Sequence, residues 1–423
     1  MSDWVRIPLG ELVDVIDPHP SHRAPDAVVQ GIPFVGIGDI REDGSLIEGK
    51  GRIVSEKIFD EHIKRYQISD RTIGFGRVAT IGKVISFRNP TTKFVVSPTM
   101  AVLEPKPGTN RDFILHALQS EDIQEQIDKL LTGSTRSSLG IELLRKLTIL
   151  HPASAVAQKI SNILNSVSNQ IGATQALIDK YTAIKQGMTA DLFSRGIDPE
   201  TKALRPTFEE APELYHKTPL GMLPKGWGVV PASTICERVI DCKNRTPPEH
   251  NEGFAVIKTS NIKNGELIAD SLTFTDEHSY HIWTARGVPQ AGDVVITREA
   301  PVGESFLITD EMPSMCLGQR TMLYRPDPEA IQPMFMYFAT RSPRFLKKLI
   351  DMAGGSTVGH VRVGDIKDMV FPKPNLSEQE LISQACLAIS DKLRTEKEFL
   401  EKLISQKSGL MQDLLTGKVP VPA

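Results

Sequence analysis

The chain has 423 residues, which is enough for two or three domains with buried cores. Its 49 Lys and Arg residues nearly balance 52 Asp and Glu residues, so the total charge gives no sign of a nucleic-acid partner, and any DNA-facing surface must be a local basic patch. The four cysteines have neither metal-ligand spacing nor a disulfide pattern, and no apolar run has the length of a signal peptide core or a membrane span, so we expect a cytoplasmic protein with reduced thiols.

Residues 1–151 predict an α+β globule. Short apolar runs, such as "IPFVGI" from Ile32 and "KVISF" from Lys83, are separated by Gly, Pro and Asn, which is typical of strands and turns. One helix is expected from Arg111 to about Leu131, because apolar residues recur there at helical spacing.

Residues 152–196 predict one long helix. Pro152 can precede a helix, and Gly196 can end one in a left-handed turn. A helix of about 42 residues is roughly 60 Å long and cannot bury an apolar seam against itself, so it needs a partner helix. The seam has heptad spacing and comprises Val156, Ile160, Ile163, Val167, Leu177, Tyr181, Ile184 and Met188.

Residues 197–226 are rich in Pro and charge and predict an extended linker. Residues 227–374 then predict a second globule that repeats the first. The matching features are Trp4 with Trp227, Arg77 with Arg298, Gly82 with Gly303, and "GST" at Gly133 with "GST" at Gly355.

Residues 375–418 predict a second long helix that repeats the first and supplies its partner. Ser377 and Glu380 suggest a capping box at its start, and Gly417 can end it. Gly187 and Gly409 lie 222 residues apart at equivalent positions. Since a glycine inside a helix costs about 1 kcal/mol, this pair indicates either close approach of another backbone or a tolerated defect.

The duplication predicts an α+β fold of two similar globules separated by two long helices, which form an antiparallel coiled coil with a pseudo-twofold internal repeat. Two copies of one reader suit a target with two separated parts, for which duplex DNA with two half-sites is the natural case. The residues predicted to pack between the helices are Ile160, Ile163, Val167, Leu177, Tyr181, Ile184, Gly187, Met188, Ile389, Leu393, Leu400, Leu403, Gly409, Leu410 and Leu414.

The sequence contains no convincing catalytic constellation, and we predict no catalytic residue and no metal site. "GFGRVATIGKV" resembles a phosphate-binding loop, but five residues separate Gly76 from Gly82 where four are needed, and Val84 replaces the Ser or Thr that would bind magnesium. His19 and His22 lie in a Pro-rich turn and are more typical of surface residues than of metal ligands.

Basic and hydroxyl side chains around the repeated motifs are candidate DNA contacts. Arg77 and Arg298 recur at the same turn, where either a DNA contact or a structural ion pair explains them. The "GST" loops either offer hydroxyl and backbone N–H groups to phosphate or form a helix C-cap and a polar turn. The candidate residues are Arg77, Lys83, Arg88, Lys93, Ser134, Thr135, Arg136, Lys243, Arg245, Lys258, Lys263, Arg298, Ser356, Thr357, His360 and Arg362.

In their order and duplication, the motifs resemble those of type I restriction–modification specificity subunits over essentially the full length. The resemblance is carried by the R-x4-G turns at Arg77 and Arg298, the "GST" loops, "LPKGW" from Leu223, "LSEQELI" from Leu376 and "GLMQDLLTGK" from Gly409. It implies that residues 1–151 and 227–374 are target recognition domains, each reading one half of a bipartite double-stranded DNA site.

The resemblance also implies that the two helices space these domains and dock two methyltransferase (modification) subunits, with restriction/translocase subunits as further partners. S-adenosylmethionine, ATP and Mg would then belong to the partner subunits, and this chain would be a non-catalytic DNA-specificity subunit without a cofactor of its own. The alternatives are a self-sufficient DNA methyltransferase or nuclease, which the missing motifs disfavour, and a structural coiled-coil scaffold, which does not explain two matching globules.

Overall fold

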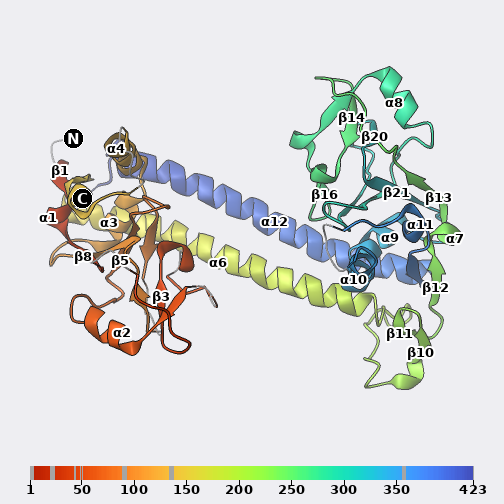
Figure 1. Ribbon diagram of the computed structural model, residues 1–423, viewed down its shortest axis with the longest axis horizontal. Coiled ribbons are helices and arrows are strands. Elements are labelled where there is room, and N and C mark those ends of the chain that lie inside the picture. The colour runs from red at the N-terminus through yellow and green to blue at the C-terminus, as the bar shows by residue number, and fades with distance from the viewer. Residues whose placement is uncertain are drawn as a thin grey trace. The chain divides into compact units, whose positions relative to one another are not determined.

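The computed structural model describes residues 4–19, 24–41, 44–47, 49, 51–87, 93–132, 138–354 and 359–422. The chain divides into two compact units, of which unit 1 comprises Met1–Leu177 with Glu396–Ala423 and unit 2 comprises Ile178–Thr395. Each unit therefore contains one globular part and segments of both long helices (Figure 1). Within the described residues, no helix is both long enough and apolar enough to cross a membrane.

Small sheets form the globular part of unit 1. A four-stranded antiparallel sheet has the order β2-β8-β5-β6, a second sheet has the order β4-β3-β7, and β1 pairs with β9. Strands β5 and β6 are buried along their whole length, which fits their sequences, in which only Ser86 is polar. The bounds are β1 Val5–Pro8, β2 Val13–Ile16, β3 Ile32–Val35, β4 Arg52–Val54, β5 Ile73–Gly76, β6 Val84–Ser86, β7 Val95–Val96, β8 Met100–Pro105 and β9 Thr148–His151.

Short helices pack around these sheets. The single helix expected from Arg111 to about Leu131 is wrong, because the segment forms two helices that meet at Ser120. The Ser120 hydroxyl donates to the Ala117 carbonyl at 2.7 Å, and its extended backbone starts the next helix, a local role that short hydroxyl side chains favour. The bounds are α1 Leu9–Leu12, η1 Ile37–Asp39, α2 Glu56–His62, α3 Arg111–Leu118, α4 Glu121–Leu131 and α5 Ile141–Lys146.

Unit 2 repeats this architecture element by element, which confirms the predicted internal duplication. Its sheets have the corresponding orders β13-β21-β18-β19, β17-β14-β20 and β12-β22, and it adds the hairpin β15-β16. The strands are β12 Gly228–Pro231, β13 Cys236–Asp241, β14 Phe254–Ile257, β15 Ile262–Lys263, β16 Glu266–Leu267, β17 Thr273–Thr275, β18 Val294–Thr297, β19 Ser305–Leu307, β20 Met315–Leu317, β21 Thr321–Pro326 and β22 Val370–Lys373. The helices are α7 Ala232–Ile235, η3 Thr259–Asn261, η4 Ala269–Ser271, α8 Glu277–Trp283, α9 Pro333–Thr340, α10 Pro343–Met352 and α11 Val363–Lys367.

The two long helices are α6, Ser154–Leu192, and α12, Leu376–Leu414. Most residues of the predicted seam are buried or partly buried: Ile160, Val167, Leu177, Tyr181, Met188, Ile389, Leu393, Leu400, Leu403, Leu410 and Leu414. The prediction is wrong for Ile163 and Ile184, which are 39% and 42% exposed. The buried face instead includes Leu164 and Ile178, one residue further along the helix than the predicted positions Ile163 and Leu177.

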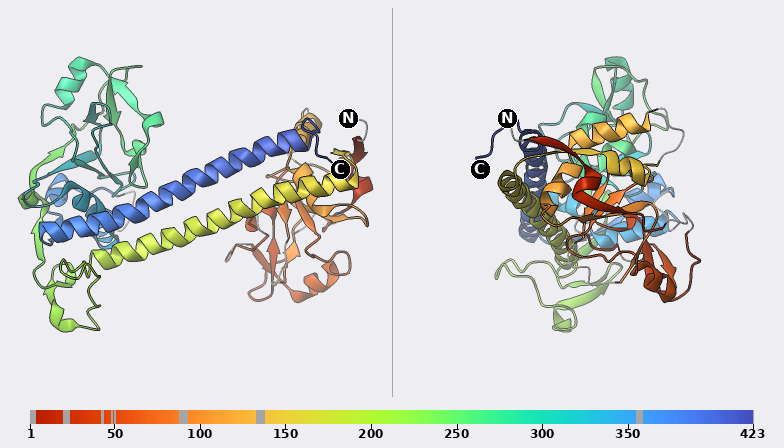
Figure 2. Two further views of the ribbon diagram at one scale, coloured as in Figure 1. Left: turned by 180° about the vertical axis from the view of Figure 1, so that it is seen from behind. Right: turned by 90° about the vertical axis from the view of Figure 1, so that its left-hand side faces the viewer.

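Each unit joins the start of one long helix to the end of the other. In the core of unit 1, Ala157 and Ile160 of α6 share a cluster with Leu414 of α12. In unit 2, Leu192 of α6 shares a cluster with Ile382 of α12. Both ribbon views show the two helix segments side by side within each unit (Figure 2).

The interior glycines and the start of α12 differ from expectation. Gly187 and Gly409 are exposed, so their predicted packing between the helices is wrong, and no atom of another described element lies within 4 Å of a Cβ added at either. The predicted capping box of Ser377 and Glu380 is also wrong. Asn375 caps α12 instead, because its side-chain oxygen accepts the Glu378 backbone N–H at 2.8 Å.

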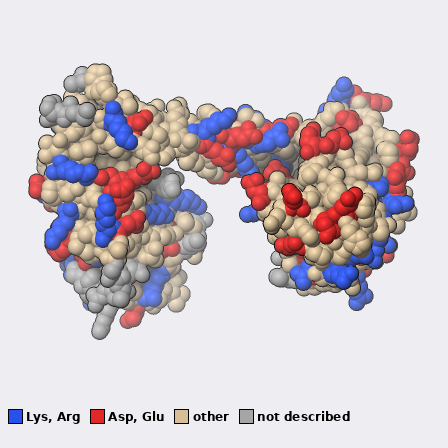
Figure 3. Space-filling view, turned by 90° about the horizontal axis from the view of Figure 1, so that it is seen from above, with Lys and Arg blue, Asp and Glu red and all other residues tan. Residues whose placement is uncertain are grey.

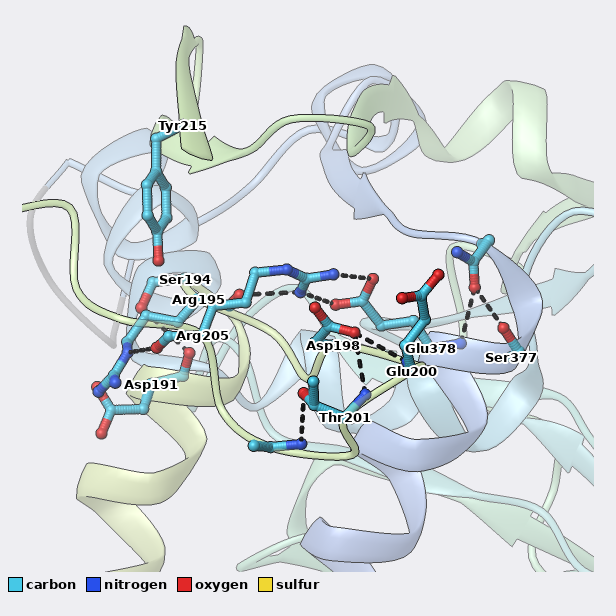
Figure 4. A network of polar contacts seen from close by, with 12 residues as sticks. Asp191, Ser194, Arg195, Asp198, Glu200, Thr201, Arg205, Tyr215, Ser377 and Glu378 are labelled. Atoms are coloured by element: carbon cyan, nitrogen blue, oxygen red, sulfur yellow. Dashed lines mark hydrogen bonds and ion pairs between the residues drawn. The ribbon is translucent and has the colours of Figure 1, made fainter. Parts of the chain in front are cut away.

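Residues 197–226 are not an extended linker but fold against the helix ends of unit 2. They contain η2, Pro212–Leu214, and a hairpin of β10, Tyr215–Thr218, with β11, Gly221–Pro224. The Arg205 guanidinium bridges the Arg195 carbonyl and the Glu378 carboxylate (Figure 4). Glu378 is only 2% exposed, so a buried ion pair ties this segment to the first turn of α12.

Candidate nucleic-acid interface

The repeated arginine of unit 1 lies beneath the loops at one end of the main sheet. Arg77 follows β5, Asp17 follows β2 and Thr99 precedes β8, so the antiparallel pairing brings all three to the same sheet end. The Arg77 Nε donates to the Leu139 carbonyl at 3.1 Å, and its Nη1 lies 3.4 Å from the Asp17 carboxylate without hydrogen-bond geometry. Arg77 is 7% exposed, so it is mostly covered by the loops that it joins.

Arg298 occupies the same place in unit 2. Its Nη1 donates to the Val361 carbonyl at 3.0 Å, and its Nε lies 3.7 Å from the Asp241 carboxylate. Its backbone N–H donates to the Arg320 carbonyl, as the backbone N–H of Arg77 donates to Thr99. Both repeated arginines thus fix three loops to one sheet end, which is the structural alternative that the sequence left open, and direct contact with DNA stays a prediction for them.

A strongly polar cleft of about 680 Å³ lies at this end of the unit 2 sheet. Its basic residues outnumber its acidic residues, which suits a polyanionic ligand. The cleft is lined by Asp241, Cys242, Lys243, Asn244, Arg245, Arg286, Arg298, Glu299, Gln319 and Arg320.

The basic loop after β13 is held on an aromatic side chain. The Lys243 Nζ and the Arg245 Cζ each lie 5.3 Å from the Trp283 ring centroid, which is cation–π geometry. The Trp283 indole N–H donates to the Arg245 carbonyl at 2.9 Å. Trp283 belongs to α8, so this helix fixes two of the predicted DNA-binding residues at the cleft wall.

A second basic hollow of about 460 Å³ adjoins this cleft and shares Asp241 and Arg286 with it. The Arg286 Nη1 donates to the Cys242 carbonyl at 2.9 Å and so supports the same loop. Arg238 and Lys367 also line this hollow and are exposed. The neighbouring hollows extend the positive surface beyond the loop that the sequence singled out.

In unit 1, a histidine pair stands where unit 2 has Lys243 and Trp283. His19 and His62 are each 6% exposed, and their ring centroids are 4.1 Å apart, so the expectation that His19 is a surface residue is wrong. His62 Nδ1 lies 3.1 Å from the Tyr66 hydroxyl. Burial, with help from His19 and Arg65, lowers the pKa of His62 to about 4, and burial also lowers the pKa of His19. Both rings are therefore neutral near pH 7, and within the described residues no group of three potential metal ligands occurs.

The same architecture at both sheet ends agrees with comparison to known proteins. The model of the type I restriction modification DNA specificity domain matches residues 1–182 and again residues 224–404. The chain belongs to the type I restriction–modification DNA specificity family.

Individual relatives of this family match over most of the chain. The putative type I restriction enzyme MjaX specificity subunit of Methanocaldococcus jannaschii is 23% identical over 433 residues, covering 99% of this chain and 94% of that protein. The MjaVIII specificity subunit of the same organism is 24% identical over 338 residues, covering 78% of this chain and 75% of that protein. The crystal structure of the type I S subunit from M. genitalium covers 100% of this chain and 97% of that chain, with a TM-score of 0.59 at 15% identity, and shows the same fold.

Other predicted contacts in the two specificity domains have partners within the fold. The Lys83 ammonium donates to the Ile37 carbonyl at 3.2 Å, Lys93 lies over the Phe59 ring, and Lys258 pairs with Glu249. Lys263 and Arg362 are exposed, and His360 pairs with Glu299 beside the cleft. Arg88, Ser134, Thr135, Arg136, Ser356, Thr357 and His22 lie outside the described residues.

Of the residues that line the unit 2 cleft, sequence reasoning predicted only Lys243, Arg245 and Arg298, and the charged residues that it missed include Arg286, Glu299 and Arg320. Glu299 directly follows Arg298. Arg320 precedes the repeated "TM" motif where the first repeat has Pro98, although in the fold its carbonyl takes the place of the Thr99 carbonyl. Glu299 and Arg320 both differ from the residues at the matching places of the first repeat, so a search for such differences would have found them. Acidic and basic side chains are interspersed over the face drawn in Figure 3, so such basic sites are local, as the balanced composition required.

Proposed function

We propose that this chain is the DNA sequence-specificity subunit of a type I restriction–modification complex, and that each globular domain reads one half of a bipartite DNA site. The observation that carries the proposal is the pair of family matches, 1–182 and 224–404, each of which contains an arginine, Arg77 or Arg298, at the same sheet end with its side chain at most 11% exposed. At equivalent positions of the two domains, unit 1 has Thr99 and unit 2 has Arg320. Such differences between otherwise similar domains are what recognition of two different half-site sequences requires.

The two long helices pair as an antiparallel coiled coil that spaces the domains and docks two modification subunits. Support comes from the shared clusters, in which the start of α6 meets the end of α12 in unit 1 and the reverse holds in unit 2. Exposed apolar side chains on the helices, including Ile184, Phe399 and Ile404, are suited to contact with a partner protein.

The chemistry belongs to partner subunits, so S-adenosylmethionine, ATP and Mg bind there, and restriction/translocase subunits join the complex. This chain then contributes DNA recognition and assembly without a catalytic group of its own. The names of its relatives, which are specificity subunits of type I restriction enzymes, support this division of labour.

The test is reconstitution of the full chain with the modification subunits of its own restriction–modification system. The complex should methylate a bipartite sequence, whereas the rigorously purified chain alone should neither methylate nor cleave DNA. Exchange of residues 1–151 for the matching domain of another specificity subunit should change one half-site and leave the other. Robust methylation by the chain alone, or a change of both half-sites after the exchange, would contradict the proposal.

A further inference from the structure

Arg320 lines the unit 2 cleft, and its backbone is held in place by a hydrogen bond to Arg298. Its backbone lies in the left-handed region at φ 76°, which residues with a side chain rarely adopt, and its carbonyl accepts the Arg298 N–H at 2.9 Å. The hydrogen bond between the Arg298 N–H and the Arg320 carbonyl therefore holds this backbone conformation at the wall of the cleft. Strained residues of this kind concentrate at binding sites, where the surrounding fold holds them in place.

The side chain of Arg320 is oriented by a carboxylate. The Arg320 Nε lies 3.0 Å from Oε2 of Glu299, and the His360 ring bonds the other carboxylate oxygen. The Glu299 side chain is 23% exposed, whereas that of Arg320 is 46% exposed. Since the ion pair with Glu299 is on the Nε side of the guanidinium, the two terminal nitrogens of Arg320 can face a ligand in the cleft.

The carboxylate decides between a phosphate and a base as this ligand. A phosphate bound by Arg320 would come close to the Glu299 charge, and like charges at such range repel. A base edge carries no net charge, and guanine presents two acceptors, O6 and N7, that match the two terminal nitrogens of an arginine. Phosphates are better placed at the neighbouring hollow, where Arg238 and Lys367 are exposed.

We propose that Arg320, oriented by Glu299, reads a guanine in the half-site of the second specificity domain. This inference rests on the proposed function, because it assigns a base to a domain that reads DNA. The first domain has Thr99 at the position of Arg320 and Val78 at the position of Glu299, so it lacks this reader. The assignment therefore predicts an effect confined to one half-site.

The test uses the methylation complex built on the full chain, with genomic DNA as substrate and sequencing that detects methylated bases. The Arg320→Ala complex should keep one half-site and the spacer intact but accept other bases at one guanine position. Arg320→Lys keeps the positive charge but loses the paired terminal nitrogens of the guanidinium, so this complex should also accept other bases at that guanine position. Competition binding with duplexes changed at that guanine should show discrimination reduced on the order of 10- to 100-fold.

Lys347→Ala is the matched control, since it removes one exposed positive charge from α10 of the same unit. It should leave the recognised sequence unchanged. Uniform weakening by Arg320→Ala on all sequences would show a phosphate contact and overturn the inference, as would an unchanged target or a half-site without guanine. If the wild-type complex recognises no bipartite sequence, the proposed function itself fails, so the two failures are distinguishable.

Discussion

Gly196 follows α6 and lies against the indole ring of Trp227, so closely that an added Cβ would overlap the ring and also Glu378 and Arg205. The same relationship occurs in unit 1, where Gly417 follows α12 and an added Cβ would lie 3.1 Å from the Trp4 ring. Both glycines have positive φ, 66° and 70°. The tryptophan that opens each domain therefore packs on the glycine that closes the helix within the same unit.

Alanine at Gly196 should strongly destabilise unit 2, because it adds backbone strain of about 1 kcal/mol to a steric overlap that costs about 1–3 kcal/mol. Gly187→Ala is the matched control. Gly187 is helical and open, so alanine there should stabilise the protein by about 0.5–1 kcal/mol. Urea unfolding followed by tryptophan fluorescence measures both changes, and equal effects of the two substitutions would contradict the proposed packing role.

The buried ion pair of Arg205 with Glu378 gives a second prediction. Arg205→Met removes one partner and leaves the Glu378 carboxylate, 2% exposed, without its cation, which should cost about 3–5 kcal/mol of the free energy of unfolding. Glu378→Leu added to Arg205→Met should recover a large part of that loss, since no buried charge then remains. The control is Arg394→Met, whose exposed pair with Asp391 should contribute less than about 1 kcal/mol.

The sequence predicted the duplication and both long helices, because a period of 222 residues and a heptad seam are properties of the chain itself. It misplaced Ile163 and Ile184, because a seam spaced three and four residues apart leaves the buried face uncertain by one position until the partner surface is known. It left the role of Arg77 and Arg298 open, since the carbonyls that they bind, Leu139 and Val361, lie more than 60 residues away in sequence. Likewise, nothing local marks Arg320 as the partner of Glu299.

Acid should destabilise unit 1 through its buried histidines. The pKa of His62 is lowered to about 4 in the folded protein, while an unfolded histidine titrates near its ordinary value of about 6.5. Between these values the unfolded state binds more protons, so stability is present above about pH 6.5 and is lost as the pH falls towards 4, by on the order of 2–3 kcal/mol. Thermal unfolding at several pH values should show this slope. His62→Phe should reduce the slope, while His116, whose pKa burial also lowers to about 4, should maintain the remainder.

The repeated arginines should act on DNA binding chiefly by positioning loops. Arg77→Ala leaves the Leu139 carbonyl and Asp17 without their partner, so we expect a loss of stability of about 1–3 kcal/mol together with weaker DNA binding by the complex. Arg298→Ala should do the same in unit 2. Weaker binding at full stability would instead indicate direct contact. In that case a base contact relaxes one half-site, and a phosphate contact weakens all sequences and flattens the salt dependence.

The lengths of α6 and α12 should set the spacer between the half-sites. Four residues lengthen a helix by about 6 Å and rotate its remaining turns by roughly 400°, which nearly restores the seam to its face. We therefore predict that insertion of four residues after Ala173 and four at the corresponding Thr395 lengthens the preferred spacer by about one or two base pairs, since DNA rises about 3.4 Å per pair. The bases of each half-site should stay the same because neither domain is altered.

Two-residue insertions rotate the seam by about 200° and should impair assembly instead. Methylation mapping decides the matter, and an active complex with its spacer unchanged would show that the helices do not set the distance.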